Sequence, residues 1–140
     1  MKRRMPGRIL THLFLLILAS STLSCSIRKM AVNTLANALS ESGSSVFATD
    51  EDPELVGDAL PVTLKVMEML LQSAPDNRGL LVAAASGFVQ YGHGYVLRPA
   101  EASELTDLAA ARKGRERAKL LFLRARDYGL RALEVDYPGI

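Results

Sequence analysis

The chain has few of the residues on which most catalytic and metal-binding sites depend. Its 140 residues include one cysteine, Cys25, and two histidines, His12 and His93. A single cysteine excludes an intramolecular disulfide, and the sequence has no nucleophile elbow, zinc-binding helix or phosphate-binding glycine loop. A catalytic function therefore has little support in the sequence. We expect no catalytic residue, no metal and no cofactor.

Acidic residues are missing from the first 24 residues, which hold four bases. The rest of the chain keeps 13 of the 17 bases against all 15 acids, a formal charge of −2, although the whole chain carries +2. The apparent basicity therefore belongs to the leader. Nucleic acid is not an expected partner of the remainder.

A long apolar run is missing from the leader as well. The run Ile9–Ala19 has eleven residues, and a helix of that length covers roughly half of the ~30 Å hydrocarbon core of a bilayer. With the basic start before it and the small residues Ser20–Ser24 after it, the run is typical of a secretory signal rather than of a retained membrane anchor.

Cys25 stands where lipoprotein signal peptidase requires a cysteine. Ser24 supplies the small side chain upstream, although Thr22 occupies a position where leucine is commoner. Attachment of a diacylglycerol explains a thiol that has no intramolecular partner, and an ordinary free thiol in a secreted chain is the alternative. Ser26, in place of an aspartate, favours the periplasmic face of the outer membrane. We predict a signal peptide over 1–24 and lipid attachment at Cys25.

Residues 25–52 have the pattern of a tether, followed by a helical domain over 53–140. Apolar residues recur at helical spacing from Ile27 to Leu39, and the run Ser42–Ser45 interrupts them as a flexible joint. Acids then gather between Asp50 and Asp58. Asp52-Pro53 is a helix start, because aspartate caps free amides and proline fits the first helical turn. A calcium loop is disfavoured, since its glycine and distal glutamate are absent.

Three long helices are predicted in the domain. The first covers Leu55–Leu71 and ends at Pro75, with Pro61 expected to kink or restart it. The second runs from Arg78 into Leu97 without a charged residue after Arg78, so a membrane span must be weighed, but its glycines and polar residues favour a helix buried in a bundle. The third is expected from Glu101 to about Val135, after Arg98-Pro99-Ala100.

The third helix combines an apolar face with a basic stretch. The predicted apolar face consists of Leu108, Ala111, Ala118, Leu121, Phe122, Ala125, Leu130 and Leu133. Eight bases lie between Arg112 and Arg131, against Glu116 and Asp127 alone. This basic stretch is either a solvated face or a contact with an acidic partner or lipid headgroups.

The helices also share a local pattern at their ends. Met67, Leu70 and Pro75 match Leu130, Leu133 and Pro138. Closing prolines of this kind are typical of tetratricopeptide-like arrays, although 63 residues separate the two, against about 34 in a standard repeat. We therefore predict an all-α fold of tetratricopeptide-like hairpins with long helices. A stack that stopped at Ile140 would leave apolar surface exposed, so the array is expected to continue or to pair with another copy.

Four aromatic side chains are candidates for lining a groove or cavity: Phe88, Tyr91, Tyr95 and Tyr128. The alternative is that they pack in the core, as aromatic residues at helical spacing usually do. His93, between two glycines, is expected to be an interior or interface residue rather than a catalytic base.

Three runs carry a resemblance to a known family: Cys25–Asn33, Ser45–Val56 and Leu123–Arg131. They resemble the T-component lipoproteins (TatT) of the tripartite ATP-independent periplasmic (TRAP) transporters, and the likeness covers nearly all of the chain after the leader. The resemblance implies a periplasmic lipoprotein of tetratricopeptide-like helices that tends to self-associate and that partners the solute-binding P-component. It also implies handling of small, apolar ligands. Family members continue well past the position of Ile140.

Two functions of different classes remain open at this point. One is a scaffold that docks the solute-binding P-component, and the other is a carrier that holds an apolar ligand between its helices. A structural envelope lipoprotein with neither role is a third alternative. A scaffold requires an exposed docking surface, whereas a carrier requires an enclosed pocket.

Overall fold

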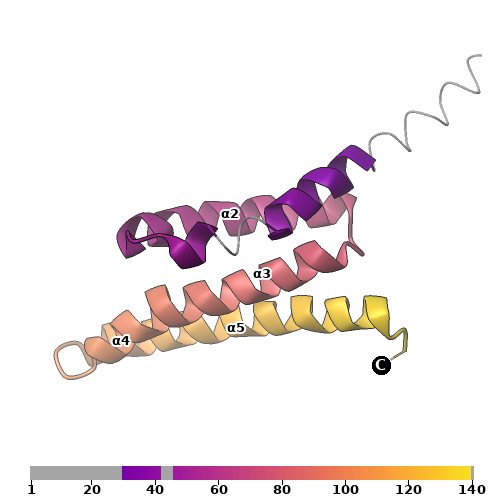
Figure 1. Ribbon diagram of the computed structural model, residues 1–140. Coiled ribbons are helices and arrows are strands. Elements are labelled where there is room, and N and C mark those ends of the chain that lie inside the picture. The colour runs from indigo at the N-terminus through magenta and orange to yellow at the C-terminus, as the bar shows by residue number, and fades with distance from the viewer. Residues whose placement is uncertain (1–29, 42–45, 140) are drawn as a thin grey trace, which may run out of the picture.

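The computed structural model describes residues 30–41 and 46–139, and these residues are helical throughout apart from short turns (Figure 1). Residues 30–41 and 46–49 are followed by α2 (Pro53–Ser73), α3 (Arg78–Tyr91), the π-helix η1 (Gly92–Leu97), α4 (Arg98–Ala102) and α5 (Leu108–Asp136). The described residues contain no strand, which confirms the all-α prediction. The predicted signal peptide, Cys25 and the predicted joint Ser42–Ser45 lie outside the described residues.

Helix α2 begins where the sequence predicts and continues further than expected. The side chain of Asp52 accepts hydrogen bonds from the backbone amides of Glu54 and Leu55, and Pro53 takes the first turn. Of the two outcomes expected at Pro61, a kink or a restart, the restart is wrong, because a single helix runs through this proline. Its buried side chains lie on both sides of Pro61, so packing compensates for the one missing N–H: Val56, Leu60, Leu64, Met67 and Leu71.

The second and third helices divide at a different point from the one predicted. Helical backbone runs from Arg78 to Ala102 through Pro99, and α5 begins at Leu108 rather than near Glu101. The reason is the π-helix, in which the amide of Arg98 bonds to the carbonyl of His93. Pro99 has no N–H and falls in the first turn of α4, where none is needed. The reversal comes at residues 103–106, and Asp107 caps α5 by accepting from the amide of Ala110.

Helix α3 lies between α2 and α5 (Figure 1). Leu80, Leu81 and Ala84 of α3 are wholly buried, and Leu64 of α2 is 2% exposed. The prediction of a buried bundle helix is therefore confirmed. No helix within 30–41 and 46–139 is long and apolar enough to cross a membrane.

Alanines at seven-residue intervals form the buried face of α5: Ala111, Ala118, Ala125 and Ala132. Seven residues are close to two helical turns, so these small side chains form a seam along which α5 approaches its neighbours closely. The predicted apolar face was wrong at its ends. Leu108 is 48% exposed at one end, and Leu130 and Leu133 are 50% and 46% exposed at the other, because the seam faces a different direction from these leucines.

The two proline-closed helix ends have the same geometry. Ala74 after α2 has φ −133° and ψ 68°, and Tyr137 after α5 has φ −135° and ψ 76°. Each donates its amide to the carbonyl four residues back, Leu70 and Leu133 respectively. The repeated local pattern in the sequence thus corresponds to a repeated helix termination.

Candidate docking face

The four aromatic residues singled out from the sequence form two stacked pairs. Phe88 of α3 stacks with Tyr128 of α5 at a centroid distance of 5.8 Å, and Tyr91 stacks with Tyr95 of η1 at 5.9 Å. Phe88 is 3% exposed, whereas the three tyrosines are partly exposed. His93, expected in the interior or at an interface, is exposed.

Three arginines of α5, here called the arginine row, lie over these rings: Arg117, Arg124 and Arg131. Arg117 lies 5.6 Å from the ring centroid of Tyr91, Arg124 lies 5.3 Å from that of Phe88, and Arg131 lies 5.6 Å from that of Tyr128. A cation over a ring face is attracted by the negative face of the π system. The rings therefore hold the arginine row against the body of the protein.

The arginine row follows directly from the alanine seam. Each of its members immediately precedes a seam alanine, which gives Arg-Ala at 117–118, 124–125 and 131–132. The heptad that buries alanine against α3 therefore places arginine on the flank beside it. The basic stretch was predicted from the sequence, whereas the row was not, although the Arg-Ala repeat is the signal that indicates it.

Second contacts fix the direction of each arginine. Arg117 donates to the hydroxyl of Tyr91 at 3.1 Å, and Arg131 donates to the carbonyl of Pro75 at 2.9 Å. Arg124 forms an ion pair of 3.4 Å with Glu68 of α2. A guanidinium has five N–H donors, so one such contact leaves most of them available.

Glu68 is the carboxylate that joins α2 to α5 on this face. It accepts hydrogen bonds from Lys65 at 2.7 Å and from the hydroxyl of Tyr128 at 2.9 Å. Partial burial disfavours its ionisation, but the two hydrogen bonds and the charge of Arg124 outweigh burial and lower the pKa of Glu68 from its usual 4.5. Burial and the neighbouring carboxylate raise the pKa of Tyr128 to about 12.

An open depression of about 330 Å³ lies at the η1 end of the row, between η1 with α4 and the first half of α5. Tyr95, Val96 and Pro99 line one side, and Lys113 and Arg117 line the other. Among the described residues no acid forms an ion pair with either of these bases. Of the four aromatic candidates, Tyr95 therefore borders a depression, while Phe88 is covered by Arg124.

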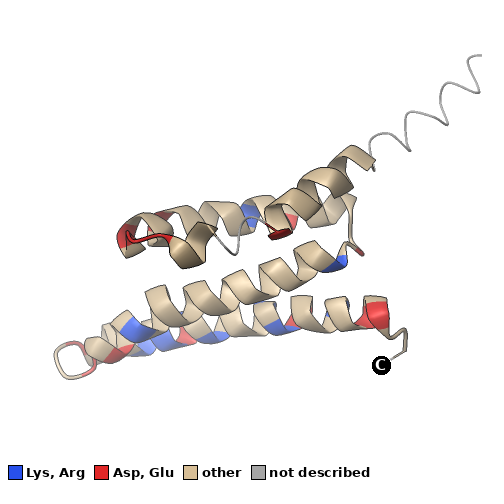
Figure 2. Cartoon of the chain, in the orientation of Figure 1, with Lys and Arg blue, Asp and Glu red and all other residues tan. Residues whose placement is uncertain are grey.

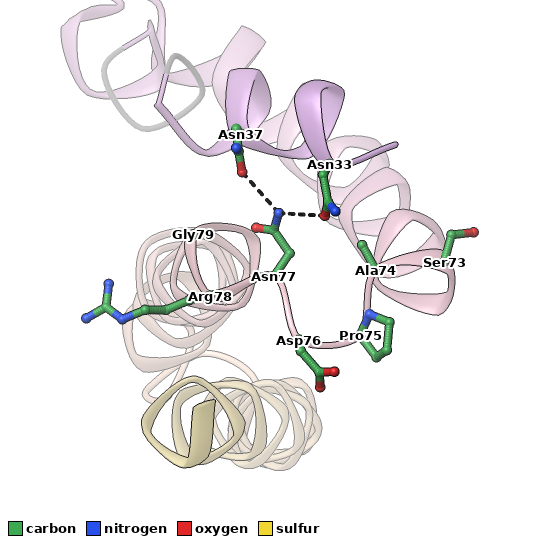
Figure 3. Close-up of a pocket in the computed structure, with 9 residues that line it drawn as sticks. All are labelled: Asn33, Asn37, Ser73, Ala74, Pro75, Asp76, Asn77, Arg78 and Gly79. Atoms are coloured by element: carbon green, nitrogen blue, oxygen red, sulfur yellow. Dashed lines mark hydrogen bonds between the residues drawn. The ribbon is translucent and has the colours of Figure 1, made fainter. Parts of the chain in front are cut away.

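A second, more polar depression of about 640 Å³ surrounds the turn between α2 and α3 (Figure 3). The side-chain amide of Asn77 donates to Asn33 at 3.1 Å and to Asn37 at 3.0 Å, while its oxygen caps α3 at the amide of Leu80. Asn77 therefore ties the helical segment 30–41 to the turn. Its hydrogen-bonding groups are used in holding the fold together.

A third feature is the apolar crevice between α2 and α3, bordered by Phe47, Leu64, Met67 and Gly87. Its volume is about 30 Å³. That space is of the size of one or two water molecules, whereas sites for small molecules usually measure about 300–1,000 Å³. The residues that the structure describes contain no group of His, Cys, Asp and Glu side chains suited to a metal ion.

These features define an all-α protein of antiparallel helices that carries an open row of arginines packed on aromatic rings. The chain belongs to the TRAP transporter T-component family, whose sequence model matches residues 49–140. The match includes α2, α3, η1, α4 and α5. The resemblance noted in the sequence is thereby confirmed.

An uncharacterized protein of Treponema pallidum (strain Nichols) is 34% identical to the chain over 128 residues. The aligned region covers 82% of this chain and 40% of that relative. The chain thus spans about two fifths of the length of the curated relative that it matches. No solved structure matches the chain.

Proposed function

We propose that the chain is an extracytoplasmic accessory component of a TRAP transporter, a helical scaffold that binds the solute-binding P-component. The observation that carries this proposal is the family match over 49–140, which spans the whole body from α2 to α5. Successive antiparallel helices with two identical terminations fit a tetratricopeptide-like array, and such arrays present extended surfaces to partner proteins.

The proposed anchor is a lipid on Cys25 after removal of residues 1–24, with residues 25–52 as the tether and 53–140 as the helical domain. The anchored protein would face the periplasm from the outer membrane. Mass spectrometry of the membrane-extracted protein tests this part. We expect the mass of the chain from Cys25 plus acyl groups, lost in the variant Cys25→Ala. An unmodified Cys25 would contradict lipid anchoring and leave the scaffold proposal standing.

Binding to the partner is tested directly. The membrane-extracted protein is immobilised in detergent, and the solute-binding protein encoded beside a TRAP membrane subunit in the same genome is passed over it in an interferometry experiment. We expect saturable binding. A solute-binding protein from an unrelated class of transporter is the matched control. Equal signals from both proteins, or none from the first, would contradict the proposal.

The apolar-ligand carrier has less support. The crevice between α2 and α3 measures about 30 Å³, and the larger depressions are open to solvent and bordered by polar or charged side chains. Organic extraction followed by mass spectrometry separates the two functions. Retained lipid-like material without capture of the solute-binding protein would favour the carrier, and failure of both tests would favour a structural envelope lipoprotein.

A further inference from the structure

We infer that the arginine row, extended by Lys113, is the surface on which the chain docks an acidic stretch of its partner protein. This inference rests on the proposed function and deepens it, because it names the face and the chemistry of the contact. It starts from the spacing of the row. Residues seven apart in a helix are about 10.5 Å apart along its axis, so the row spans about 21 Å.

Charge on this flank of α5 is not balanced by the protein itself. Arg115, Lys119 and Arg126 have acidic partners in Glu104, Glu116 and Asp127. Glu68 is the one carboxylate that pairs with the arginine row among the described residues, and it also serves Lys65 and Tyr128. Figure 2 shows the bases recurring along α5, whereas acids gather at the start of α2. The row therefore retains a net positive charge.

The rings prepare the row for carboxylates. A free arginine loses rotational freedom when it binds, but a guanidinium already held over a ring and tied by one hydrogen bond has lost much of that freedom beforehand. Arg117 and Arg131 are tied by a hydrogen bond and Arg124 by its ion pair with Glu68, and the N–H donors that each guanidinium keeps lie at its edge, where they match a carboxylate. Guanidinium groups that are already ordered in this way bind a carboxylate at a lower entropic cost, whereas a face that contacts only solvent does not need them to be ordered.

The spacing indicates the form of the partner segment. Carboxylates seven residues apart in a helix lie on one face, repeat at about 10.5 Å and match successive arginines. The chain's own acidic cluster is a weaker occupant, because Asp50 and Asp52 already accept backbone amides of their own segment. A second copy of the chain and an anionic membrane become outcomes of the test.

The test compares two triple variants of equal charge. The row variant carries Arg117→Gln, Arg124→Gln and Arg131→Gln, and the control carries Arg112→Gln, Lys119→Gln and Arg126→Gln, which removes three exposed positive charges of α5 outside the row. Binding of the solute-binding protein that is encoded beside the TRAP membrane subunit is measured at two salt concentrations. We expect the row variant to bind at least about tenfold more weakly and with a smaller salt dependence, and the control to bind within about threefold of the wild type.

A third variant separates charge from the guanidinium fork. The substitutions Arg117→Lys, Arg124→Lys and Arg131→Lys retain the positive charge without the fork, so they should restore the salt dependence of binding but less than half of the lost binding energy, and circular dichroism should show helical content unchanged in all variants. Equal binding by row and control variants would overturn the inference while the proposed function survived. Absence of binding by the wild type would overturn both.

Two further measurements identify a wrong occupant. The sedimentation coefficients of the row variant and of the control variant are each compared with that of the wild type. If only the row variant differed from the wild type, the row would be an interface between copies and the inference would fail. If the row variant alone lost binding to vesicles of anionic phospholipid while partner binding was unaffected, the row would face a membrane and the inference would also fail.

Discussion

The hydroxyl of Tyr128 on α5 donates a 2.9 Å hydrogen bond to Oε1 of Glu68 on α2, across 60 residues of sequence. The contact passes over α3, whose Phe88 stacks against the Tyr128 ring. It joins the first and last of the long helices directly. Most of the other packing that holds α2 and α5 together runs through α3. The same two residues lie beside Arg124 and Arg131, so the stability of the fold and the shape of the docking face are linked.

Tyr128 should titrate unusually late. Its pKa is raised to about 12 by burial and by the neighbouring carboxylate of Glu68. Because the folded state holds this proton more tightly than the unfolded chain, the resulting stability is present below pH 10 and is lost as the pH rises from 10 towards 12. A spectrophotometric titration of tyrosinate absorbance should show a late component that is absent in Tyr128→Phe. Superimposable curves for the two proteins would contradict this assignment.

Replacement of Glu68 should weaken the fold in a pH-dependent manner. Its pKa is lowered in the folded protein, so its contribution is present above the unfolded value of 4.5 and is lost as the pH falls through the folded value. We expect Glu68→Gln to reduce the free energy of unfolding by about 1–2 kcal/mol at pH 7, as is typical for the loss of charge-assisted hydrogen bonds.

Urea unfolding at pH 7 and pH 3 measures this effect. The loss in Glu68→Gln should be smaller at pH 3 than at pH 7, because protonation of the wild-type carboxyl becomes more favourable as the pH falls. Glu134→Gln, which removes an exposed carboxylate of α5, is the control and should change stability by less than about 0.5 kcal/mol. A loss of the same size at both pH values would show that the effect is not electrostatic.

Local signals in the sequence predicted the helix ends that side chains cap. Asp52 accepts the amides of its first turn as expected, and Pro75 follows the end of α2. The reversal between the second and third helices was not predictable in this way. Pro99 is a break signal, yet a π-helix upstream lets the chain absorb it.

The packing of α5 was predicted only in part because large apolar residues were weighted equally with alanine. The alanine at every seventh position gives a better indication of the buried direction than Leu130 or Leu133 does, since close helix packing requires small side chains. The Arg-Ala repeat can also be recognised in the sequence of α5. The contact of Tyr128 with Glu68 cannot be recognised in this way, because no local pattern specifies a pair 60 residues apart.

Two leucine substitutions test this correction of the core. Leu81 is wholly buried, and Leu130 is 50% exposed. Leu81→Ala should cost about 2–5 kcal/mol of unfolding free energy, because it leaves a cavity, whereas Leu130→Ala should cost about 1 kcal/mol or less. Both are measured by urea unfolding of the membrane-extracted protein. Equal losses would mean that Leu130 is buried in solution.

Two glycines of α5 should respond to alanine with opposite signs. A methyl group on Gly114 would contact the Cβ of Ala100 on α4, while one on Gly129 would meet nothing within 4 Å. Gly129→Ala should raise the free energy of unfolding by about 0.5–1 kcal/mol, because alanine loses less conformational entropy in a helix. Gly114→Ala carries the same helix preference but must push α5 away from α4, so we expect a net loss of about 1–3 kcal/mol. Because the two positions share one helix and one substitution, helix propensity cancels in the comparison. A stabilised Gly114→Ala would show that α4 and α5 are not held together as closely as the structure has them, and the depression beside Lys113 and Arg117 would then have a different shape.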